Sequence, residues 1–382
     1  MKIIHVDFVG PYTEGMSYQE NILPACQARK ENEVLFFAPC IKWENAKIVK
    51  TEQVEKIMED GVKLVRFPYV NLPINILTRA FRPVKGIYRR LCEEKPDVIM
   101  LHGAQTFVTM AVCKYKKKYP QVRVVVDDHS DYNNSATNFL TRYLLHRTIY
   151  RCLAKMVENV ADIYYYITPE TKNFLMKEYG ISKAKLRLLP LGGICFSDEI
   201  YNEKRNRKRE ELGLSEDRVL VIHSGKLGPG KKTRELIEGF SKLEYKNITL
   251  AIIGQAEGEI LSYIESVVRS DTRITFLGWK SGSELQEYLC AADIYAQPGT
   301  QSATLQNAIC CRCAVMVHPY PSHEILVKGN GCYVSDADEI TEALKKMVSG
   351  EVLKEMSGAS QQLGQELLDY NMLAKRVIEE KL

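Results

Sequence analysis

The sequence lacks any extreme of charge and any long apolar run. Its 52 basic and 48 acidic side chains leave a net charge of +4 over 382 residues, which is too small for a protein that coats nucleic acid. The longest uncharged stretch, Ile294 to Cys311, contains Gln, Pro, Ser and Asn and does not span a membrane. The first residues are too few and too charged for a signal peptide. These absences predict a cytoplasmic protein without nucleic-acid partners, attached to a membrane at most by its surface.

Cysteine is present, but not in a metal-binding or disulfide pattern. The 11 cysteines show no repeated zinc-ligand spacing. The cluster of Cys310, Cys311 and Cys313 has no histidine or cysteine partner group at the spacing of a metal site. An odd count in a chain of this length also argues against a disulfide framework. We therefore expect reduced thiols and no metal site.

Short apolar runs alternate with longer helical patterns in both halves, which predicts strand–helix–strand units and parallel sheets. The strands are expected at Lys2–Val9, Glu33–Ala38, Val62–Phe67, Val98–His102, Val122–Val126 and Ile163–Ile167, and then at Arg218–His223, Thr249–Ile253, Ile274–Leu277, Ile294–Gln297 and Ala314–His318. The Pro- and Gly-containing stretch Leu188–Gly193 separates the two series. We expect an α/β chain of two doubly wound, Rossmann-like domains, 1–190 and 191–360, facing across a ligand cleft. A C-terminal helix within 361–382 is expected to pack back on the first domain.

One strand-to-helix loop in the second half concentrates glycine and lysine. It reads Ser224-Gly225-Lys226-Leu227-Gly228-Pro229-Gly230-Lys231-Lys232-Thr233, ahead of a helix expected at Arg234–Lys242. Backbone amides and cations that converge in such a loop suit a diphosphate, although the G-K-[ST] ending of a P-loop is missing. The alternative is a solvated basic loop.

A second loop of the same half joins a strand end to a further helix. Ser302 is the expected N-cap of a helix at Ala303–Arg312, and the small residues there leave first-turn amides open to a phosphate. Asn307 lies about one turn further along, within reach of a ribose hydroxyl. The alternative is a capped core helix without a ligand.

Two features of the first half follow predicted strands. The loop from Gly10 to Asn21 carries Gly15 and lacks the G-x-G-x-x-G spacing, so it suits an anion or sugar, or is a turn that needs glycine. His129 follows a buried strand directly. That place at the carboxyl end of a strand favours a functional role over a structural one, and more weakly the same holds for His102.

Taken together, these stretches resemble glycosyltransferase family 4, whose members have the two-domain GT-B fold. Gly225-Lys226-Leu227 with Pro229 and Lys231 resembles the family's G-R-L-x-P-x-K phosphate loop, and Phe276-Leu277-Gly278-Trp279 resembles its F-L-G-aromatic turn. The stretches Gly15–Asn21 and Val126–Ser135 look like those of members assigned to bacterial capsule and surface-polysaccharide synthesis. The family's E-x7-E pair is missing. Asn307 stands at its second glutamate and Gly299 stands eight residues earlier, whereas a shortened loop would make Gln301 the stand-in for the first glutamate.

The resemblance implies a retaining, metal-independent glycosyltransferase in bacterial cell-surface glycan synthesis. It would need no cofactor, and would move a sugar from a nucleotide diphosphate donor, with a UDP-sugar favoured, to a polysaccharide or lipid-linked oligosaccharide acceptor. A sugar-nucleotide epimerase on the same fold and a catalytically silent binding subunit are the alternatives.

The resemblance also assigns roles to individual residues. Catalysis would rest on His129, Lys226 and Lys231. The nucleotide-sugar site would comprise Gly15, Gly225, Gly278, Trp279, Gln301, Ser302, Ala303, Thr304 and Asn307. In this assignment the lysines and the amides of 302–304 neutralise the diphosphate, Gly278 and Trp279 border the base, and Asn307 contacts the ribose. His129 would contact the donor sugar, and Gly15 would let the acceptor-side loop approach.

Basic and bulky apolar residues are interleaved in the first half, which carries a net charge of +9 over residues 1–190. Residues 71–90 hold five basic side chains and no acidic one, and residues 142–151 repeat that mixture. Pro73, Pro83 and Gly86 predict short helices there rather than one long amphipathic helix. The mixture suits an anionic membrane surface. The alternative is a pair of core helices with solvated basic faces.

Overall fold

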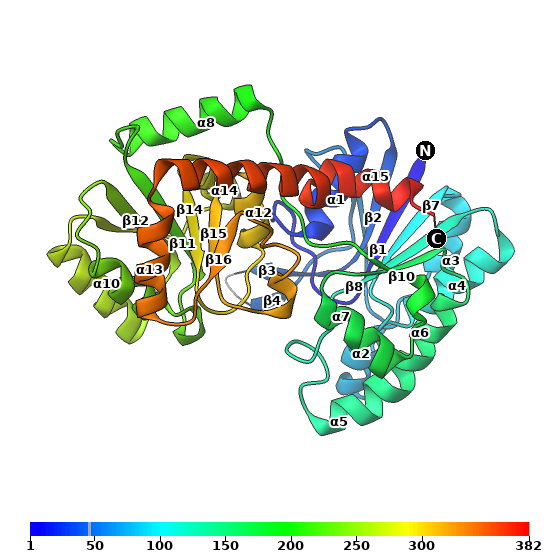
Figure 1. Cartoon of the computed structure of the whole chain (residues 1–382). Coiled ribbons are helices and arrows are strands. Elements are labelled where there is room, and N and C mark those ends of the chain that lie inside the picture. Colours follow the sequence, from blue (N-terminus) through cyan, green and yellow to red (C-terminus); the bar gives the residue numbers. More distant parts are fainter. Residues whose placement is uncertain (45–46, 382) are drawn as a thin grey trace. The chain divides into compact units, whose positions relative to one another are not determined.

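The computed structural model describes residues 1–44 and 47–381, which form two units (Figure 1). Unit 1 comprises Met1–Pro190 together with the chain from Leu373 onward, and unit 2 comprises Leu191–Met372. Each unit contains one large sheet that is covered by helices on both faces, as in a Rossmann-like domain.

Unit 1 contains an eight-stranded sheet in the order β10-β9-β8-β7-β1-β2-β6-β5. Its neighbours are parallel, except that β5 runs antiparallel to β6. The strands are β1 Lys2–Asp7, β2 Glu33–Pro39, β5 Glu55–Ile57, β6 Lys63–Phe67, β7 Val98–His102, β8 Arg123–Asp128, β9 Ile163–Tyr166 and β10 Leu186–Leu188, beside a hairpin of β3 Ile41–Glu44 and β4 Lys47–Lys50. The chain moves outward from β1 in both directions, so the topological switch point of this sheet lies between β1 and β7.

The two faces of the unit 1 sheet bury separate apolar cores. Ile4 and Val6 of β1 belong to the larger core, which also holds residues of α3, α4 and α6. Ile3 faces the other way, with Ala28 of α1 and Ile378 of α15, because side chains alternate along a strand. The helices are α1 Gln19–Ala28, α2 Asn75–Phe81, α3 Ile87–Glu94, α4 Val108–Lys118, α5 Phe139–Thr141, α6 Arg151–Glu158, α7 Pro169–Phe174 and α15 Tyr370–Glu379, with π-helices η1 Arg142–Tyr150 and η2 Leu175–Tyr179 and the 3₁₀ turn η3 Lys183–Lys185.

The last helix of the chain is tied into unit 1 by hydrogen bonds. Arg123 Nε on β8 donates to the carbonyl oxygen of Val377 (2.9 Å), and the Tyr165 hydroxyl on β9 donates to Glu380 Oε2 (2.9 Å). In return, Arg376 Nη2 donates to the carbonyl oxygen of Leu188 (3.0 Å). Residues Leu373 to Lys381 therefore complete a unit whose other residues are Met1–Pro190.

Unit 2 contains a six-stranded, wholly parallel sheet in the order β13-β12-β11-β14-β15-β16. The strands are β11 Val219–Lys226, β12 Ile248–Gln255, β13 Ile274–Gly278, β14 Ile294–Gln297, β15 Ala314–Val317 and β16 Gly331–Tyr333. The helices are α8 Asp198–Glu211, α9 Thr233–Ser241, α10 Gly258–Ser270, α11 Gly282–Ala291, α12 Thr304–Cys310, α13 Ala337–Met347 and α14 Gly350–Leu363, with the π-helix η6 Gly364–Leu368 and the 3₁₀ turns η4 Pro229–Lys231 and η5 Pro321–His323. The strand order reverses between β11 and β14, which is the switch point of this sheet.

All of the strands predicted from apolar runs are present, with ends shifted by a few residues. The prediction missed the short strands β5, β10 and β16 and the hairpin of β3 and β4. The residues of β5 are all exposed, so no apolar run marks it. The prediction of short helices between residues 71 and 90 is confirmed by α2 and α3.

One predicted helix boundary is wrong. The helix expected at Ala303–Arg312 spans Thr304–Cys310, with Ala303 rather than Ser302 at its N-cap position. Ala303 already has helical backbone angles and no side chain that could cap. The Ser302 hydroxyl still accepts a hydrogen bond from the Thr304 amide at 3.3 Å.

Candidate functional site

The glycine- and lysine-rich loop of unit 2 connects the end of β11 to the start of α9. Gly225 has a φ of +138°, which L side chains rarely adopt, and a Cβ atom there would lie 3.3 Å from Lys231 Cε. The loop therefore needs glycine at this position to let the lysine stem pass close to the backbone. Leu227 is buried under the loop, whereas Lys226 is exposed.

Lys231 joins this loop to the one that follows β14. Its Nζ donates to the carbonyl oxygens of Thr300 and Gln301, each at 3.0 Å, and the Thr300 amide donates to the Gly230 carbonyl at 2.8 Å. A Cβ atom on Gly299 would lie 2.1 Å from the Gly230 carbonyl oxygen, so this contact also requires glycine. Burial lowers the pKa of the Lys231 ammonium. The structure thus brings the predicted phosphate loop and Gln301 together at the switch point of the unit 2 sheet.

The residues after Gln301 lie beside Tyr295, a buried side chain of β14. Its hydroxyl lies 3.3 Å from Ser224 Oγ of β11, and burial raises its pKa to about 12 although the hydroxyls of Ser224, Thr304 and Ser302 act to lower it. Asn307, one turn into α12, donates from Nδ2 to the Ala303 carbonyl at 3.3 Å. The predicted segment 302–304 therefore lies beside the same two central strands as the phosphate loop.

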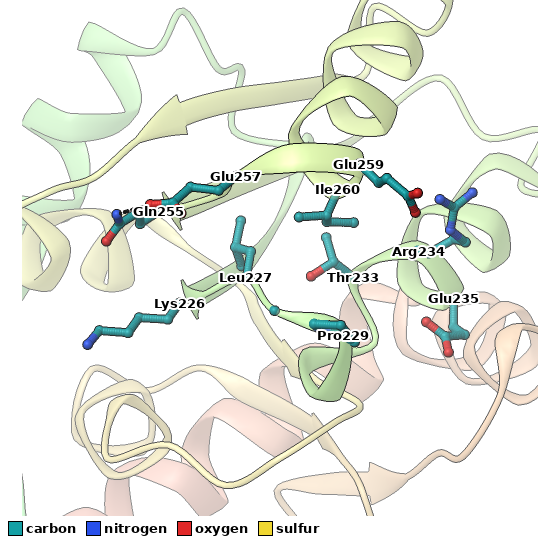
Figure 2. A pocket seen from close by; sticks show the side chains of 11 residues that line it. Lys226, Leu227, Pro229, Thr233, Arg234, Glu235, Gln255, Glu257, Glu259 and Ile260 are labelled. Atoms are coloured by element: carbon teal, nitrogen blue, oxygen red, sulfur yellow. Dashed lines mark hydrogen bonds between the residues drawn. The ribbon is translucent and has the colours of Figure 1, made fainter.

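A pocket of about 590 Å³ opens beside the phosphate loop. Figure 2 shows Lys226 and Gln255 toward one end of it, and Arg234 with Glu259 toward the other. The lining residues are Lys226, Leu227, Gly228, Pro229, Thr233, Arg234, Glu235, Gln255, Glu257, Glu259 and Ile260. The sequence interpretation missed those from Arg234 onward. The turn from Gln255 to Gly258 is itself a strand-to-helix loop, which is the signal that could have found some of them.

Gly278 is the last residue of β13 and Trp279 follows it, at the same carboxyl edge of the sheet. Gly278 pairs in register with Ile253 of β12 and has a φ of +65°, which favours glycine. Trp279 is 67% exposed and is not among the residues that line the pocket.

Unit 1 has a pocket of its own, of about 290 Å³, at its switch point. Its walls come from the segments that follow β1, β7 and β8, and they include the predicted His129 and His102. The full lining is Asp7, Val9, Gly10, Pro11, Glu20, His102, Gly103, Gln105, Asp128, His129, Ser130, Asn134 and Ser135. Gly15 lies in the loop after β1 with a φ of +74°, exposed and outside this lining.

Asp127, at the end of β8, connects the histidines of this pocket. Its fully buried carboxylate lies 3.3 Å from His129 Nε2 and 3.0 Å from His102 Nδ1, and it accepts a hydrogen bond from Gln19 Nε2 at 3.0 Å. Burial opposes a charge on His129, but the hydrogen bond and negative charge of Asp127 outweigh it and raise the pKa of His129 to about 9. Burial likewise opposes the charge on Asp127, yet the two histidines hold its pKa below its usual range.

Two further carboxyl groups of the pocket are held in other states. Burial raises the pKa of Asp7 to about 6. Burial also raises the pKa of Asp128, whose Oδ2 accepts a hydrogen bond from Gln105 Nε2 at 2.6 Å. Carboxyl, amide and imidazole groups are the groups with which proteins bind the hydroxyls of a sugar. The sequence interpretation did not select Asp7, Gln105 or Asp127, because single polar residues after strands carry no spacing signal.

Two kinds of feature are absent from the described ranges, 1–44 and 47–381. They contain no group of three or more His, Cys, Asp or Glu side chains that could hold a metal ion. Within the same ranges, no helix has both the length and the apolar character needed to cross a membrane.

The sequence matches two family models, one in each half. Residues 24–192 match the model described as Glycosyltransferase Family 4, and residues 218–349 match the model described as Glycosyl transferases group 1. No curated protein matches the sequence.

Many solved structures are similar over nearly the whole chain. The sucrose-phosphate synthase from Thermosynechococcus elongatus is 16% identical with a TM-score of 0.66, covering 98% of this chain and 97% of that one. HepE from Anabaena in complex with UDP is 13% identical with a TM-score of 0.66, covering 99% and 98%, and was also solved with UDP-glucose. The lipopolysaccharide outer core galactosyltransferase WaaB is 16% identical with a TM-score of 0.61, covering 99% of each chain. At these identities the likeness shows the fold.

Proposed function

Because the chain belongs to the glycosyltransferases, with a family 4 domain followed by a group 1 domain in the GT-B fold, we propose that it transfers a sugar from a nucleotide diphosphate sugar to a glycan acceptor with retention of configuration. The observation that carries this proposal is the junction of two loops at the switch point of unit 2. There, Lys231 is bonded to the carbonyls of Thr300 and Gln301, and Lys226 lines the adjacent pocket.

The lysines would act on the leaving group. When the bond from the sugar to the diphosphate breaks, negative charge builds up on the phosphate oxygens. Fixed cations stabilise that charge by roughly 3–4 kcal/mol per contact in a site that excludes water. Lys226, Lys231 and the amides of 302–304 would supply this stabilisation without a metal ion or other cofactor. We propose a UDP-sugar as donor, on the support of the similar HepE structures with UDP and UDP-glucose.

The remaining predicted residues would recognise the donor. Gly278 and exposed Trp279 would border the nucleobase, and Asn307 would bind the ribose hydroxyls in place of a glutamate. Gln301 would bind the hydroxyls of the donor sugar, since an amide both donates and accepts hydrogen bonds. In unit 1, His129 would contact the donor sugar from its own pocket, and Gly15 would allow the acceptor-side loop to approach.

An apolar surface on unit 1 supports a lipid-linked acceptor. Four apolar side chains of α2, α5 and η1 are 60–73% exposed, and the Tyr150 hydroxyl ties these segments together by donating to the Ala80 carbonyl at 2.7 Å. They are Ile76, Phe139, Leu140 and Leu144. We propose that this apolar surface, with nearby basic residues, docks on the anionic inner face of the cell membrane, where a lipid-linked oligosaccharide of cell-surface glycan synthesis would present its sugar.

Flotation with liposomes tests the docking. The protein should float with anionic vesicles at low salt and much less with neutral ones, and the double substitution Ile76→Ser with Phe139→Ser should release it. Arg79→Gln and Lys85→Gln should each weaken binding, at about 1 kcal/mol per charge. Lys246→Gln is the matched control, because it removes one charge from an exposed lysine of unit 2, outside this surface. Failure to float with any vesicle would indicate a soluble acceptor.

A donor panel tests the proposed activity. UDP, GDP, ADP and their sugars would be screened by thermal shift, and the best donor incubated with and without lipid-linked oligosaccharides. We expect stabilisation by UDP-sugars and transfer with the anomeric configuration kept. Interconversion of the nucleotide sugar without acceptor would instead indicate an epimerase. Donor binding without turnover over the acceptor panel would indicate a silent binding subunit.

A further inference from the structure

A row of buried hydrogen-bonding side chains leads from the core of unit 1 to its pocket. Gln27 Oε1 lies 2.6 Å from His5 Nε2, and His5 Nδ1 lies 2.9 Å from His102 Nε2. His102 Nδ1 then bonds to Asp127 Oδ2 at 3.2 Å, and the same oxygen lies 3.3 Å from His129 Nε2. We call these five residues the Asp127 chain. Only its last member, His129, has a side chain that is substantially exposed, at 42%.

The contacts of the inner end fix where its protons are. Gln27 Nε2 donates to the carbonyl oxygen of Ala374 in α15 (3.4 Å), so the amide oxygen faces His5. His5 must therefore donate from Nε2, and a neutral His5 then accepts at Nδ1. Burial supports the neutral ring, since it lowers the pKa of His5 to about 3.

His102 is consequently a donor at both ring nitrogens. Its Nε2 must donate to His5 Nδ1, and its Nδ1 faces a carboxylate that can only accept. A ring that donates at both nitrogens is a positively charged imidazolium. Burial opposes this charge, but the negative charge of Asp127 and its hydrogen bond to the ring raise the pKa of His102 above its ordinary value.

We propose that His102 is a positioning residue, which keeps Asp127 ionised and aimed at His129 so that the His129 ring faces the pocket in one orientation and as a cation. Because His129 Nε2 is taken by Asp127, its Nδ1 is the nitrogen left for a ligand. This inference rests on the proposed function for the reaction that His129 would serve. The geometry of the chain stands apart from it.

Other charged groups also face these histidines. Glu20 of α1 and Asp7 of β1 act on His102 in the same direction as Asp127, and Glu20 and Asp128 do so on His129. None of these groups, all in the described part of the chain, makes a hydrogen bond to either ring. An effect that depends on the orientation of the His129 ring must therefore act through Asp127.

Two measurements on the full-length protein test the proposal. The first is a pH titration of the ¹⁵N-labelled histidines by NMR. His102 is expected to stay doubly protonated through neutral pH, and the His129 midpoint near pH 9 should fall by at least one pH unit in Asp127→Asn. The second is the pH profile of sugar transfer by His102→Phe. We expect kcat to fall at least tenfold with KM for the donor nearly unchanged, and the acid limb to move up by a pH unit or more as Asp127 becomes easier to protonate.

Matched variants separate positioning from packing. His146→Phe removes another buried ring of unit 1, whose Nδ1 meets the Tyr179 hydroxyl at 2.9 Å, and it should lower thermal stability without moving the acid limb. His5→Gln keeps an acceptor for His102 and should retain more activity than His5→Phe.

The outcomes distinguish this inference from the proposed function. A neutral His102 in the titration, or a His102→Phe enzyme whose kcat and acid limb match the wild type per folded molecule, would overturn the positioning role. If the titration is as expected and no transfer occurs with any donor, the proposed function fails while the chain stands.

Discussion

The two units have similar sheets, but different types of residue line their switch points. Unit 2 uses glycines, backbone carbonyls and lysines, nearly all from one contiguous loop and the segment after β14. Unit 1 uses the carboxylate of Asp127 with three histidines and Gln27, and its hydrogen bonds join residues that lie 22, 97 and 25 positions apart along the chain. A site of the first kind suits a diphosphate, whose charge is the same for every nucleotide. A site of the second kind is held together by hydrogen bonds between titratable side chains, so its geometry and charge depend on pH.

The largest expected effect is on the unfolding free energy when Asp127 of unit 1 is replaced. Asp127→Asn removes the charge that the His102 imidazolium needs, and an unpaired buried charge costs about 3–5 kcal/mol of unfolding free energy. Denaturant unfolding would measure the loss. The neighbour Asp128→Asn is the control and should cost clearly less, because burial already favours the neutral form of Asp128. Equal losses of unfolding free energy in the two variants would mean that Asp127 does not stabilise a charged His102.

The next effect belongs to unit 2. Lys231→Ala should lower kcat by about 10²–10³-fold, the range for losing one contact to a developing negative charge. Lys232→Ala should be mild, since Lys232 Nζ donates to the Ser335 carbonyl at 2.8 Å, away from the loop junction. Steady-state transfer assays would compare the two. Similar losses in both variants would make the loop no more than a basic surface.

Between about pH 6.5 and 9, the two units should diverge in stability. The pKa of His129 is raised in the folded state, so its contribution is complete below the unfolded value of about 6.5 and is lost as the pH rises through about 9. In unit 2, burial lowers the pKa of His223 to about 4, so this ring is neutral throughout that window. Hydrogen exchange at pH 6.5, 7.5 and 9 should show protection falling in β7 and β8 but not in β11. A parallel decline in both units would contradict it.

The smallest effect on folding is expected at Trp279. Because this ring is two-thirds exposed, Trp279→Ala should change the unfolding free energy by less than about 0.5 kcal/mol. If the ring borders the base, the thermal shift given by UDP should nevertheless shrink. Trp43→Ala in unit 1, at 42% exposure, is the matched surface change and should leave that shift intact.

The same contrast explains what could be predicted from the sequence. Strands that are buried on both faces consist of continuous apolar runs, so the central strands of both sheets could be predicted from the sequence. The glycine- and lysine-rich loop could be recognised because its glycines and lysines are adjacent, and its role in binding phosphate stays a prediction. The chain through His5 and Gln27 was not, since hydrogen bonds between distant elements leave no local spacing. Short edge strands such as Glu55–Ile57 were not predicted for a different reason. Their residues are exposed, so they need not be apolar and form no apolar run.

The tie between α15 and unit 1 has a consequence for how the protein is made. A ribosome releases the chain from its N-terminus, so the first 190 residues are available long before the helix that completes their unit. Until this segment is synthesised, Arg123 lacks its partner Val377, Tyr165 lacks Glu380, and the apolar face around Ile3 lacks Ile378. Domains that emerge first usually fold first. Here the first unit to emerge must wait for residues from Leu373 onward, and removal of residues 373–381 would leave these contacts unmade.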